Sequence, residues 1–523
     1  MQDKYFDVLI IGSGIAGLSA AIAAAEKGAS VAVLSKEKEI TNCNTNHAQG
    51  GIVAAAQGDT SEALIKDINS AGDFLNNNAA VDYLVKNGAP LIEPFLAGKI
   101  GVPFCRKEDG HYDMTREGNH SFRRILHVKD YSGAAIEEHL ANYAMKLNNI
   151  TILTQSTVVD LITNSKHSKD CQERYKSTKV IGAYYFQETT GKVKKIFSGS
   201  TILATGGVGK LFTFSSNTSG ATGDGLALAE RVGAEIINCE YVQFHPTVLF
   251  NRDIKDFLIS EAMRGEGARL RNRKGEYFMK RYSPQLMDLA PRDEVSRAIY
   301  QEMENDDAGY VWLDARQIKH VKLEERFPKI FEKCMSAGID IRKDLIPVVP
   351  AAHYFCGGVK VDLEGKTSVN GLWAAGEISC TGVHGANRLA SVSLMEGFVW
   401  GLNAGLSAAS ASKSLTDNEL LKSIPDWVYA EKQELFDPLL VYQDMSMITK
   451  IMWNYCGIVR TKNRLGRAIS DISYLRHRIE KFYSSAIIKR NIIELRNAVI
   501  AAEIIVRSAL ANGQSKGCHF LVD

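Results

Sequence analysis

A single carboxylate lies among basic residues in the segment TREGNHSFRRILH, which spans residues 115–127. The acid is Glu117, and its basic neighbours are Arg116, His120, Arg123, Arg124 and His127. Two interpretations are open from the segment alone. It is either a solvated charge run in which Glu117 balances an arginine, or it offers one carboxylate to a positively charged group of a ligand. The choice depends on the other motifs of the chain.

Four further cationic side chains stand in short motifs later in the chain. They are His245 in FHPT, Arg292 in APRD, His353 in AAHYFCGGV and Arg388 in GANR. A ligand with two buried carboxylates needs paired donors, and a bidentate arginine supplies geometry as well as charge. Taken singly, either histidine is more often a satisfied structural residue. As a set, the four suit a dicarboxylate.

Three glycines, Gly12, Gly14 and Gly17, form a GxGxxG motif after the apolar run FDVLII and before the alanine-rich stretch LSAAIAAAEKG. With SVAVLSK following, this pattern predicts strand, tight turn, helix and second strand. Glycine allows the backbone to turn tightly and approach a pyrophosphate, which binds to the free N–H groups of the helix N-terminus. The motif therefore predicts a dinucleotide site.

The acidic residue that would bind an adenosine ribose at the end of the second strand is absent, because Ser35 and Lys36 stand there. This disfavours a plain NAD site. Two remote carboxylates, Glu377 in GLWAAGE and Asp224 in ATGDG, are suited to accept hydrogen bonds from polyol hydroxyls. One βαβ unit with remote carboxylates favours FAD over NAD.

The elements that position these residues are spread along the chain. STILATGG (200–207) and GLWAAGE (371–377) again place a strand directly before glycines, so the nucleotide-binding domain is discontinuous and residues 239–354 form an insertion. The Ser/Ala-rich stretch LSAASASKS indicates the edge of another unit. Beyond it, MSMITKIMWNYCGIV and IIELRNAVIAAEIIV carry apolar residues at spacings of three and four, which predicts a C-terminal helical bundle.

Composition excludes several classes of function. The chain has 523 residues, and its 62 basic and 60 acidic residues produce no field that would attract nucleic acid. The nine cysteines include no CxxC pair, so they indicate reduced thiols in the cytosol and neither disulfides nor a metal site. The apolar run at the N-terminus is too short for a signal peptide or a membrane anchor.

The motifs together resemble one flavoprotein family. GSGIAG, AQGGI, LATGG, GDG, FHPT, RGEGA, APRD, AAHYFCGGV, GLWAAGE and GANRLASVSL occur in an order similar to that of the succinate dehydrogenase and fumarate reductase flavoproteins. The resemblance implies an α/β fold with a Rossmann-like FAD-binding domain, an inserted α+β capping domain and a C-terminal helical bundle. We expect the FAD-binding domain at 1–238 and 355–407, the capping domain at 239–354 and the helical domain at 408–523.

The same resemblance implies roles for individual residues. Arg292 would transfer a proton and Arg388 would clamp a carboxylate. The substrate site would consist of Glu117, His245, Thr247, Arg292, His353 and Arg388. The expected FAD contacts are Gly12, Ser13, Gly14, Ile15, Ala16, Gly17, Lys36, Asn44, Thr45, Asn46, His47, Ala48, Gln49, Gly50, Gly51, Ala204, Thr205, Gly206, Asp224, Glu377, Ser393 and Leu394.

The mode of FAD attachment follows from one position. Respiratory members of the family attach FAD covalently through a histidine in a pattern similar to SHTVAAQGG. Aligned on AQGG, this chain reads CNTNHAQGG, which places Asn44 at the attachment position and His47 out of register. We therefore expect non-covalent FAD.

TREGNHS is similar to a TREGGHS-type segment of the L-aspartate oxidase branch, in which the glutamate faces the substrate amino group. This implies that Glu117 recognises an amine, because a site made only of cations would repel an α-ammonium. Asn119 departs from the glycine common in that segment. An ion pair of Glu117 with Arg123 or Arg124 remains the structural alternative.

The chain ending SKGCHFLVD resembles the ESRGLHY-type ending of the same branch, with Cys518 and His519 replacing part of that pattern. The resemblance implies a freestanding enzyme that oxidises L-aspartate to iminoaspartate for quinolinate and NAD synthesis. O2, giving H2O2, or fumarate would be the electron acceptor, and quinolinate synthase a transient partner. The alternatives are a soluble fumarate reductase or succinate dehydrogenase-like flavoprotein, and a flavin-binding protein without catalysis.

Overall fold

The strand, tight turn and helix predicted at the N-terminus are present in the computed structural model, which describes residues 4–412, 418–431 and 437–522. The unit consists of β1 (Lys4–Ile11), α1 (Ile15–Glu26) and β2 (Val31–Leu34). β1 and β2 pair in parallel, and β2 is buried along its whole length. A strand covered on both faces needs a continuous apolar run, which is why VAVL forms it.

β1 and β2 belong to a seven-stranded main sheet with the order β5-β2-β1-β8-β7-β6, in which β15 also pairs with β8. The other strands are β5 (Ile150–Leu153), β6 (Ser156–Thr163), β7 (Val180–Gln187), β8 (Lys192–Leu203) and β15 (Leu372–Ala374). β5, β2, β1, β8 and β15 run parallel, so the loops after their carboxyl ends meet at one edge. The three glycine loops identified in the sequence therefore converge there.

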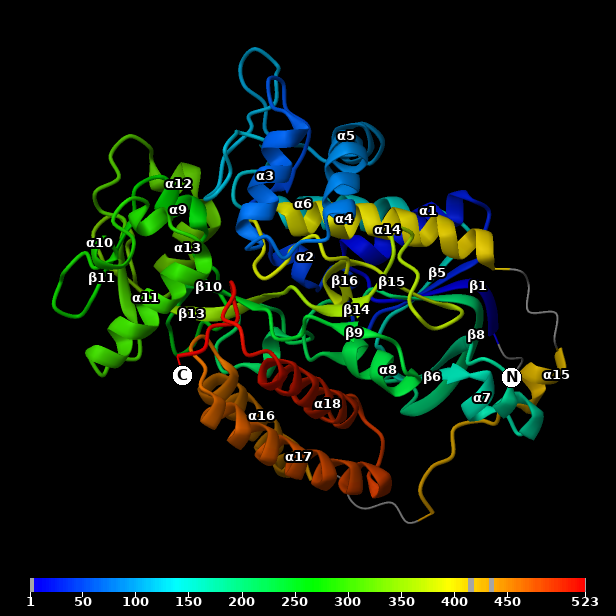
Figure 1. Cartoon of the computed structure of the whole chain (residues 1–523). Coiled ribbons are helices and arrows are strands. Elements are labelled where there is room, and N and C mark those ends of the chain that lie inside the picture. The colour runs from blue at the N-terminus through cyan, green and yellow to red at the C-terminus, as the bar shows by residue number, and fades with distance from the viewer. Residues whose placement is uncertain (1–3, 413–417, 432–436, 523) are drawn as a thin grey trace.

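Helices cover both faces of the main sheet (Figure 1). The helices on one face are α1, α6 (Ser132–Met145) and α14 (Val392–Ala411), and those on the other are α8 (Asp224–Val232) and α18 (Arg490–Ala511). Successive residues of β1 alternate between the two cores: Val8 and Ile10 pack on the first face and Leu9 and Ile11 on the second. The predicted α/β fold is confirmed.

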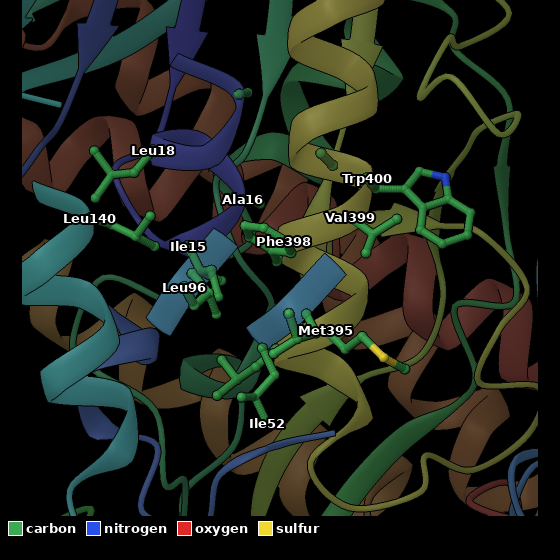
Figure 2. Close-up of a cluster of buried hydrophobic side chains, with 14 of the residues drawn as sticks. Ile15, Ala16, Leu18, Ile52, Leu96, Leu140, Met395, Phe398, Val399 and Trp400 are labelled. Atoms are coloured by element: carbon green, nitrogen blue, oxygen red, sulfur yellow. The ribbon is translucent and has the colours of Figure 1, made fainter. Parts of the chain in front are cut away.

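α14 packs closely along α1 (Figure 2). Gly401 and Gly405 of α14 lie against the backbone of Ala16 and Ala20, where any side chain would collide. The predicted domain boundary at 407/408 falls inside α14, because the small residues that suggested an edge continue this helix to Ala411. The start of α14 is thereby fixed beside the glycine turn.

The connection between β2 and β5 carries several short elements. They are α2 (Asn44–His47), β3 (Ile52–Val53), α3 (Ser61–Ala71), α4 (Asn78–Tyr83), α5 (Ala89–Ile92) and β4 (Ile125–Leu126). β3 and β4 pair antiparallel. This pairing brings the segment that contains Glu117 beside Gly50 and Gly51.

A second, four-stranded sheet lies to one side of the main sheet (Figure 1). Its strands, in order, are β10 (Val242–Leu249), β13 (Ile346–Phe355), β12 (Val311–Asp314) and β11 (Arg269–Arg271). Its helices are α9 (Glu261–Gly265), α10 (Met279–Tyr282), α11 (Arg292–Asn305), α12 (Leu323–Arg326) and α13 (Pro328–Ser336). The predicted insertion limits, 239 and 354, fall three residues before β10 and one residue inside the end of β13.

A small sheet of β9 (Ile236–Ile237), β14 (Gly358–Lys360) and β16 (Ser379–Cys380) adjoins the insertion. The C-terminal region contains α15 (Asn418–Ser423), α16 (Pro438–Cys456), α17 (Lys462–Ser485) and α18, and the last three pack together as the amphipathic pattern predicts. Among the described residues, no helix is long and apolar enough to cross a bilayer.

Candidate active site

One elongated cavity runs from the carboxyl edge of the main sheet to the four-stranded sheet. Its first end is lined by Gly12 to Ala16 and Lys36, and its second end by Glu117 and the four predicted cations. The cavity thus brings together residues that are more than 370 positions apart in the chain, such as Gly12 and Arg388.

The glycine turn approaches neighbouring backbone closely. Gly12 has a φ of 115° and lies against Ala204, while Gly17 lies against the carbonyl of Gly12, so neither position has room for a Cβ. Gly14 is the N-cap of α1 and provides no side-chain cap. The N–H of Ile15 donates to Thr45 Oγ1 at 3.0 Å, so the next N–H groups of α1, those of Ala16 and Gly17, are the ones left for an anion. This arrangement fits a pyrophosphate.

Other polar atoms along the cavity support the fit to FAD. The Thr205 hydroxyl and Gln49 Oε1 are buried without a hydrogen-bond partner among the described residues. Buried polar atoms of this kind are normally satisfied, and both belong to residues that line the cavity, which supports a polar ligand there. Of the predicted FAD contacts, all line the cavity except Gly17, which packs under the turn, and Asn46, which lies outside the lining.

Lys36 forms an ion-pair cluster at the first end of the cavity. Its Nζ lies 2.5 Å from Asp224 Oδ2 and 2.9 Å from Glu494 Oε1. Burial lowers the pKa of Lys36, but the two carboxylates outweigh it and raise that pKa above its ordinary value. Asp224 Oδ1 also accepts from Asn497 Nδ2 at 3.0 Å. Glu494 was not predicted, because it enters the site from the C-terminal helix α18.

Asn44 and Glu377 also line the cavity. Asn44 Oδ1 accepts hydrogen bonds from Thr218 N at 2.9 Å and from the Thr218 hydroxyl at 3.1 Å. Glu377 Oε1 accepts from Phe355 N at 3.0 Å, and burial raises the pKa of this carboxyl to about 7. Asn44 is thus fixed in place by the loop that contains Thr218, and Glu377 by the end of β13.

The four predicted cations meet at the second end. β10 and β13 are neighbours in the insertion sheet, and they place the rings of His245 and His353 with centroids 5.2 Å apart. Burial, followed by the charges of Arg292 and Arg388, lowers the pKa of both histidines well below the ordinary value. Both rings are therefore neutral at pH 7.

The neutral state assigns a donor role to His245. His245 Nδ1 accepts from Thr247 N at 3.2 Å, which leaves the proton on Nε2, and Nε2 is buried with no partner among the described residues. His353 Nδ1 lies 2.7 Å from the Ser216 hydroxyl. A neutral imidazole with one free N–H is suited to donate to a carboxylate oxygen.

Thr247 does not take the place predicted for it. It is fully buried behind the cavity lining, and its hydroxyl donates to Ile259 O at 2.8 Å. The hydroxyl is thus engaged by the backbone, and Thr247 acts on the site through its N–H bond to His245.

Glu117 lies in the same cavity, beside the four cations. Its Oε2 accepts a 2.6 Å hydrogen bond from the Ser391 hydroxyl. Burial, and next the negative charge of Glu261, raise the pKa of Glu117 above its ordinary value.

The structural alternative for Glu117 is wrong. Arg124 is fully buried and pairs with Asp59 and Asp67, at 2.6 Å each, and Arg123 is exposed. The arginines of the segment therefore do not balance Glu117. Arg124 instead anchors the segment to Asp67 in α3 and to Asp59, which stands two residues before that helix begins.

Sequence reasoning missed a second carboxylate, Glu261. Its Oε2 accepts from Arg292 Nε at 2.7 Å and its Oε1 from Gly118 N at 2.9 Å. Burial raises its pKa, but Arg292 and Arg264 outweigh burial and hold the pKa at about 2. Glu261 stands three residues before Arg264 of the RGEGA motif, and that proximity was the one available signal.

Comparison with known proteins agrees with this geometry. The FAD binding domain family matches residues 7–394, and the fumarate reductase flavoprotein C-terminal family matches residues 445–523. An L-aspartate oxidase of Pseudomonas aeruginosa is 41% identical over 533 residues, which cover 100% of this chain and 96% of the relative. An L-aspartate oxidase of Halobacterium salinarum is 40% identical over 528 residues, 99% of this chain and 96% of the relative.

Among solved structures, a quinol fumarate reductase of E. coli superposes with a TM-score of 0.88 at 30% identity, covering 100% of this chain and 92% of that chain. The matches span the glycine turn, the insertion and the C-terminal helices alike. The chain therefore belongs to the L-aspartate oxidase family, within the FAD-binding flavoproteins related to fumarate reductase.

Proposed function

We propose that this chain is an FAD-dependent L-aspartate oxidase that converts L-aspartate to iminoaspartate. The observation that carries the proposal is the position of Glu117, a carboxylate in the same cavity as His245, His353, Arg292 and Arg388. Four cations or donors alone suit a dicarboxylate. One added carboxylate suits a dicarboxylate that also bears an ammonium group.

FAD, when bound, supplies the acceptor for the hydride that leaves Cα of the substrate. The glycine turn and the N-terminus of α1 would hold its pyrophosphate, and Thr205, Gln49 and Glu377 would contact it from the other walls. Asn44 stands where a covalent attachment would need histidine. We therefore expect denaturation to release all of the flavin, and flavin that stays on the chain after acid precipitation would contradict this.

The two carboxylates of L-aspartate would bind to the neutral histidines and the two arginines. His245 would donate its Nε2–H and His353 would contact the substrate as a second neutral ring, so neither adds charge, while Arg292 and Arg388 supply the charge and two-pronged geometry. This division limits the repulsion among the site's own cations before substrate arrives.

Glu117 would hold the α-ammonium. The carboxylate is fixed by Ser391, and an ammonium beside it lowers its pKa, so that substrate binding favours the ionised form. A charge-assisted hydrogen bond of this kind contributes roughly 1.5 to 3 kcal/mol. Holding the nitrogen also fixes the direction of the Cα hydrogen, which lowers the barrier through orientation.

Arg292 would transfer a proton when fumarate takes the place of O2 as acceptor. A guanidinium group holds its proton strongly, so Arg292 needs a partner that returns the proton. Glu261 lies 2.7 Å from Arg292 Nε, and the buried Arg264 follows at 3.9 Å from Glu261. These three side chains lead from the site toward Asp288, whose carbonyl accepts from Arg264.

Fumarate or O2, giving H2O2, would accept the electrons, and iminoaspartate would pass to quinolinate and NAD synthesis. Because iminoaspartate hydrolyses readily, we propose a transient handover to quinolinate synthase. The nine cysteines are all free thiols, which supports a cytosolic location.

One experiment separates this function from its rivals. In an anaerobic titration, L-aspartate should bleach the flavin and fumarate should restore its colour, while succinate should bleach it poorly. Strong bleaching by succinate alone would favour a fumarate reductase or succinate dehydrogenase-like enzyme. Failure of every dicarboxylate to change the flavin would indicate a binding protein without catalysis.

A further inference from the structure

Gln243 lies directly behind the two arginines of the substrate site. It belongs to β10, two residues before His245, and is fully buried. Its side-chain oxygen accepts hydrogen bonds from Arg292 Nη1 and from Arg388 Nε, each at 3.2 Å. One neutral oxygen atom therefore joins two guanidinium groups that repel each other.

The amide of Gln243 can face the arginines in one orientation alone. Guanidinium groups are donors and never acceptors, so the oxygen must point toward them. The nitrogen then points away and donates to Asn387 Oδ1 at 2.6 Å and to Arg388 O at 2.8 Å. Every polar atom of the Gln243 amide is thus engaged.

The side-chain amide of Asn387 is also fixed in one orientation, in this case by the carboxylate of Asp293. Its Nδ2 donates to Asp293 Oδ1 at 2.9 Å, and an ionised carboxylate accepts hydrogen bonds without donating. The Cys518 thiol also donates to Asn387 Oδ1, at 3.3 Å. Asp293 is itself held by Arg297 at 2.9 Å on α11. A carboxylate at one end and two guanidinium groups at the other therefore fix both amides between them.

This chain of contacts connects two motifs whose remaining residues had no role. Asp293 follows Arg292 in APRD, and Asn387 precedes Arg388 in GANR. Each arginine enters the cavity, while its neighbour in the sequence faces the other motif behind the cavity. The separation of the two arginines is set where these contacts meet, at Gln243.

We propose that Gln243 is a positioning residue that fixes the spacing of Arg292 and Arg388, and so determines the length of diacid that the site prefers. The proposal rests on the proposed function, because it assumes that the two arginines bind the substrate carboxylates. Asn387 orients Gln243 and is itself oriented by Asp293.

Three diacids test the proposal: malonate, succinate and glutarate, which differ by one methylene each. They are titrated into the FAD-loaded protein while the flavin absorbance is followed. The unaltered protein should prefer the four-carbon diacid, which has the length of aspartate. Gln243→Met keeps the side-chain length but removes the shared acceptor, so succinate should bind about tenfold more weakly. The binding of glutarate and malonate should weaken much less in the same variant.

The ratio of dissociation constants is the decisive readout, since partial misfolding would reduce the active fraction without changing the ratio. Asn387→Ala should shift the ratio in the same direction, and it serves as the test if Gln243→Met does not fold. The double variant should match Gln243→Met, because both act through one contact chain. Gln187→Met, in β7 and bonded to Thr154 O away from the cavity, is the matched control.

The outcomes separate the two proposals. An unaltered preference for succinate in both variants would overturn the role of Gln243 and leave the proposed function standing. If the unaltered protein binds L-aspartate but none of the three diacids, the role of Gln243 in the choice of diacid length fails alone. If it binds neither L-aspartate nor any diacid, the proposed function fails, and the role of Gln243 fails with it.

Discussion

The hydroxyl of Ser391 donates a 2.6 Å hydrogen bond to Glu117 Oε2 across 274 positions of sequence. Ser391 has a φ of 60° and is the N-cap of α14, so the bond depends on an unusual backbone conformation. On the other side, Glu117 Oε1 fills the space where a Cβ at Gly50 would stand. The carboxylate is therefore held in one place by two parts of the FAD-binding region.

Glu117→Gln should separate the two activities of the site. The variant keeps the side-chain size but loses the charge that meets the ammonium. We expect kcat/KM for L-aspartate to fall by about 10- to 100-fold, the value of one charge-assisted hydrogen bond. Fumarate reduction by artificially reduced enzyme should change far less, because fumarate has no amine. Glu138→Gln, on the exposed face of α6, is the control, and equal losses of both activities would assign Glu117 a structural role.

The pH dependence of aspartate oxidation should report the interaction of Glu117 with Glu261. Burial and the charge of Glu261 raise the pKa of Glu117, and the ionised form binds the ammonium. Activity should therefore be lost as pH falls through this raised pKa, at a higher pH than an exposed carboxylate would give. Glu261→Gln removes the like charge, so the acid limb of kcat/KM should move to lower pH, whatever happens to the maximal rate. An acid limb that moves to higher pH in Glu261→Gln would contradict this interaction between the two carboxylates.

The glycine turn could be predicted from the sequence because its causes are local. Gly12 and Gly17 stand between a β-branched run and an alanine-rich run, and each part selects its own conformation. The placement of His245 and Arg388 in one cavity has no such local cause. No local pattern places them together, and their prediction depended on resemblance to a family.

Glu261 and Thr247 show why the remainder could not be predicted. Glu261 acquires its role from Arg292, 31 residues later, and apart from its closeness to the RGEGA motif nothing in its own neighbourhood distinguishes it from a solvated acid. Thr247 stands in the expected motif, but its hydroxyl is captured by Ile259 O once the chain turns back at the end of β10. Long-range contacts decided both cases.

Asn119 should prove to be a conformational requirement of the Glu117 segment. It has a φ of 65°, in the left-handed region that asparagine and glycine tolerate, which explains why a glycine suits this position. Asn119→Gly should change the free energy of unfolding by less than about 1 kcal/mol, whereas Asn119→Val should lower it by about 1–2 kcal/mol. Urea titration measures both, and equal effects of glycine and valine would contradict the argument.

Arg124 should contribute more to stability than any surface ion pair, because it is fully buried with both of its partners nearly so. Its Nε and Nη1 lie 2.6 Å from Asp59 and Asp67, whose side chains are 8% and 11% exposed. Arg124→Met leaves two carboxylates without their cation, so the free energy of unfolding should fall by about 3–5 kcal/mol. Arg124→Lys should recover part of this loss, since lysine cannot bond both acids in the same fork geometry. Lys86→Met, which breaks the exposed pair with Asp82, should leave the urea midpoint almost unchanged. A similar midpoint for Arg124→Met and Lys86→Met would show that the buried pair does not hold the segment in place.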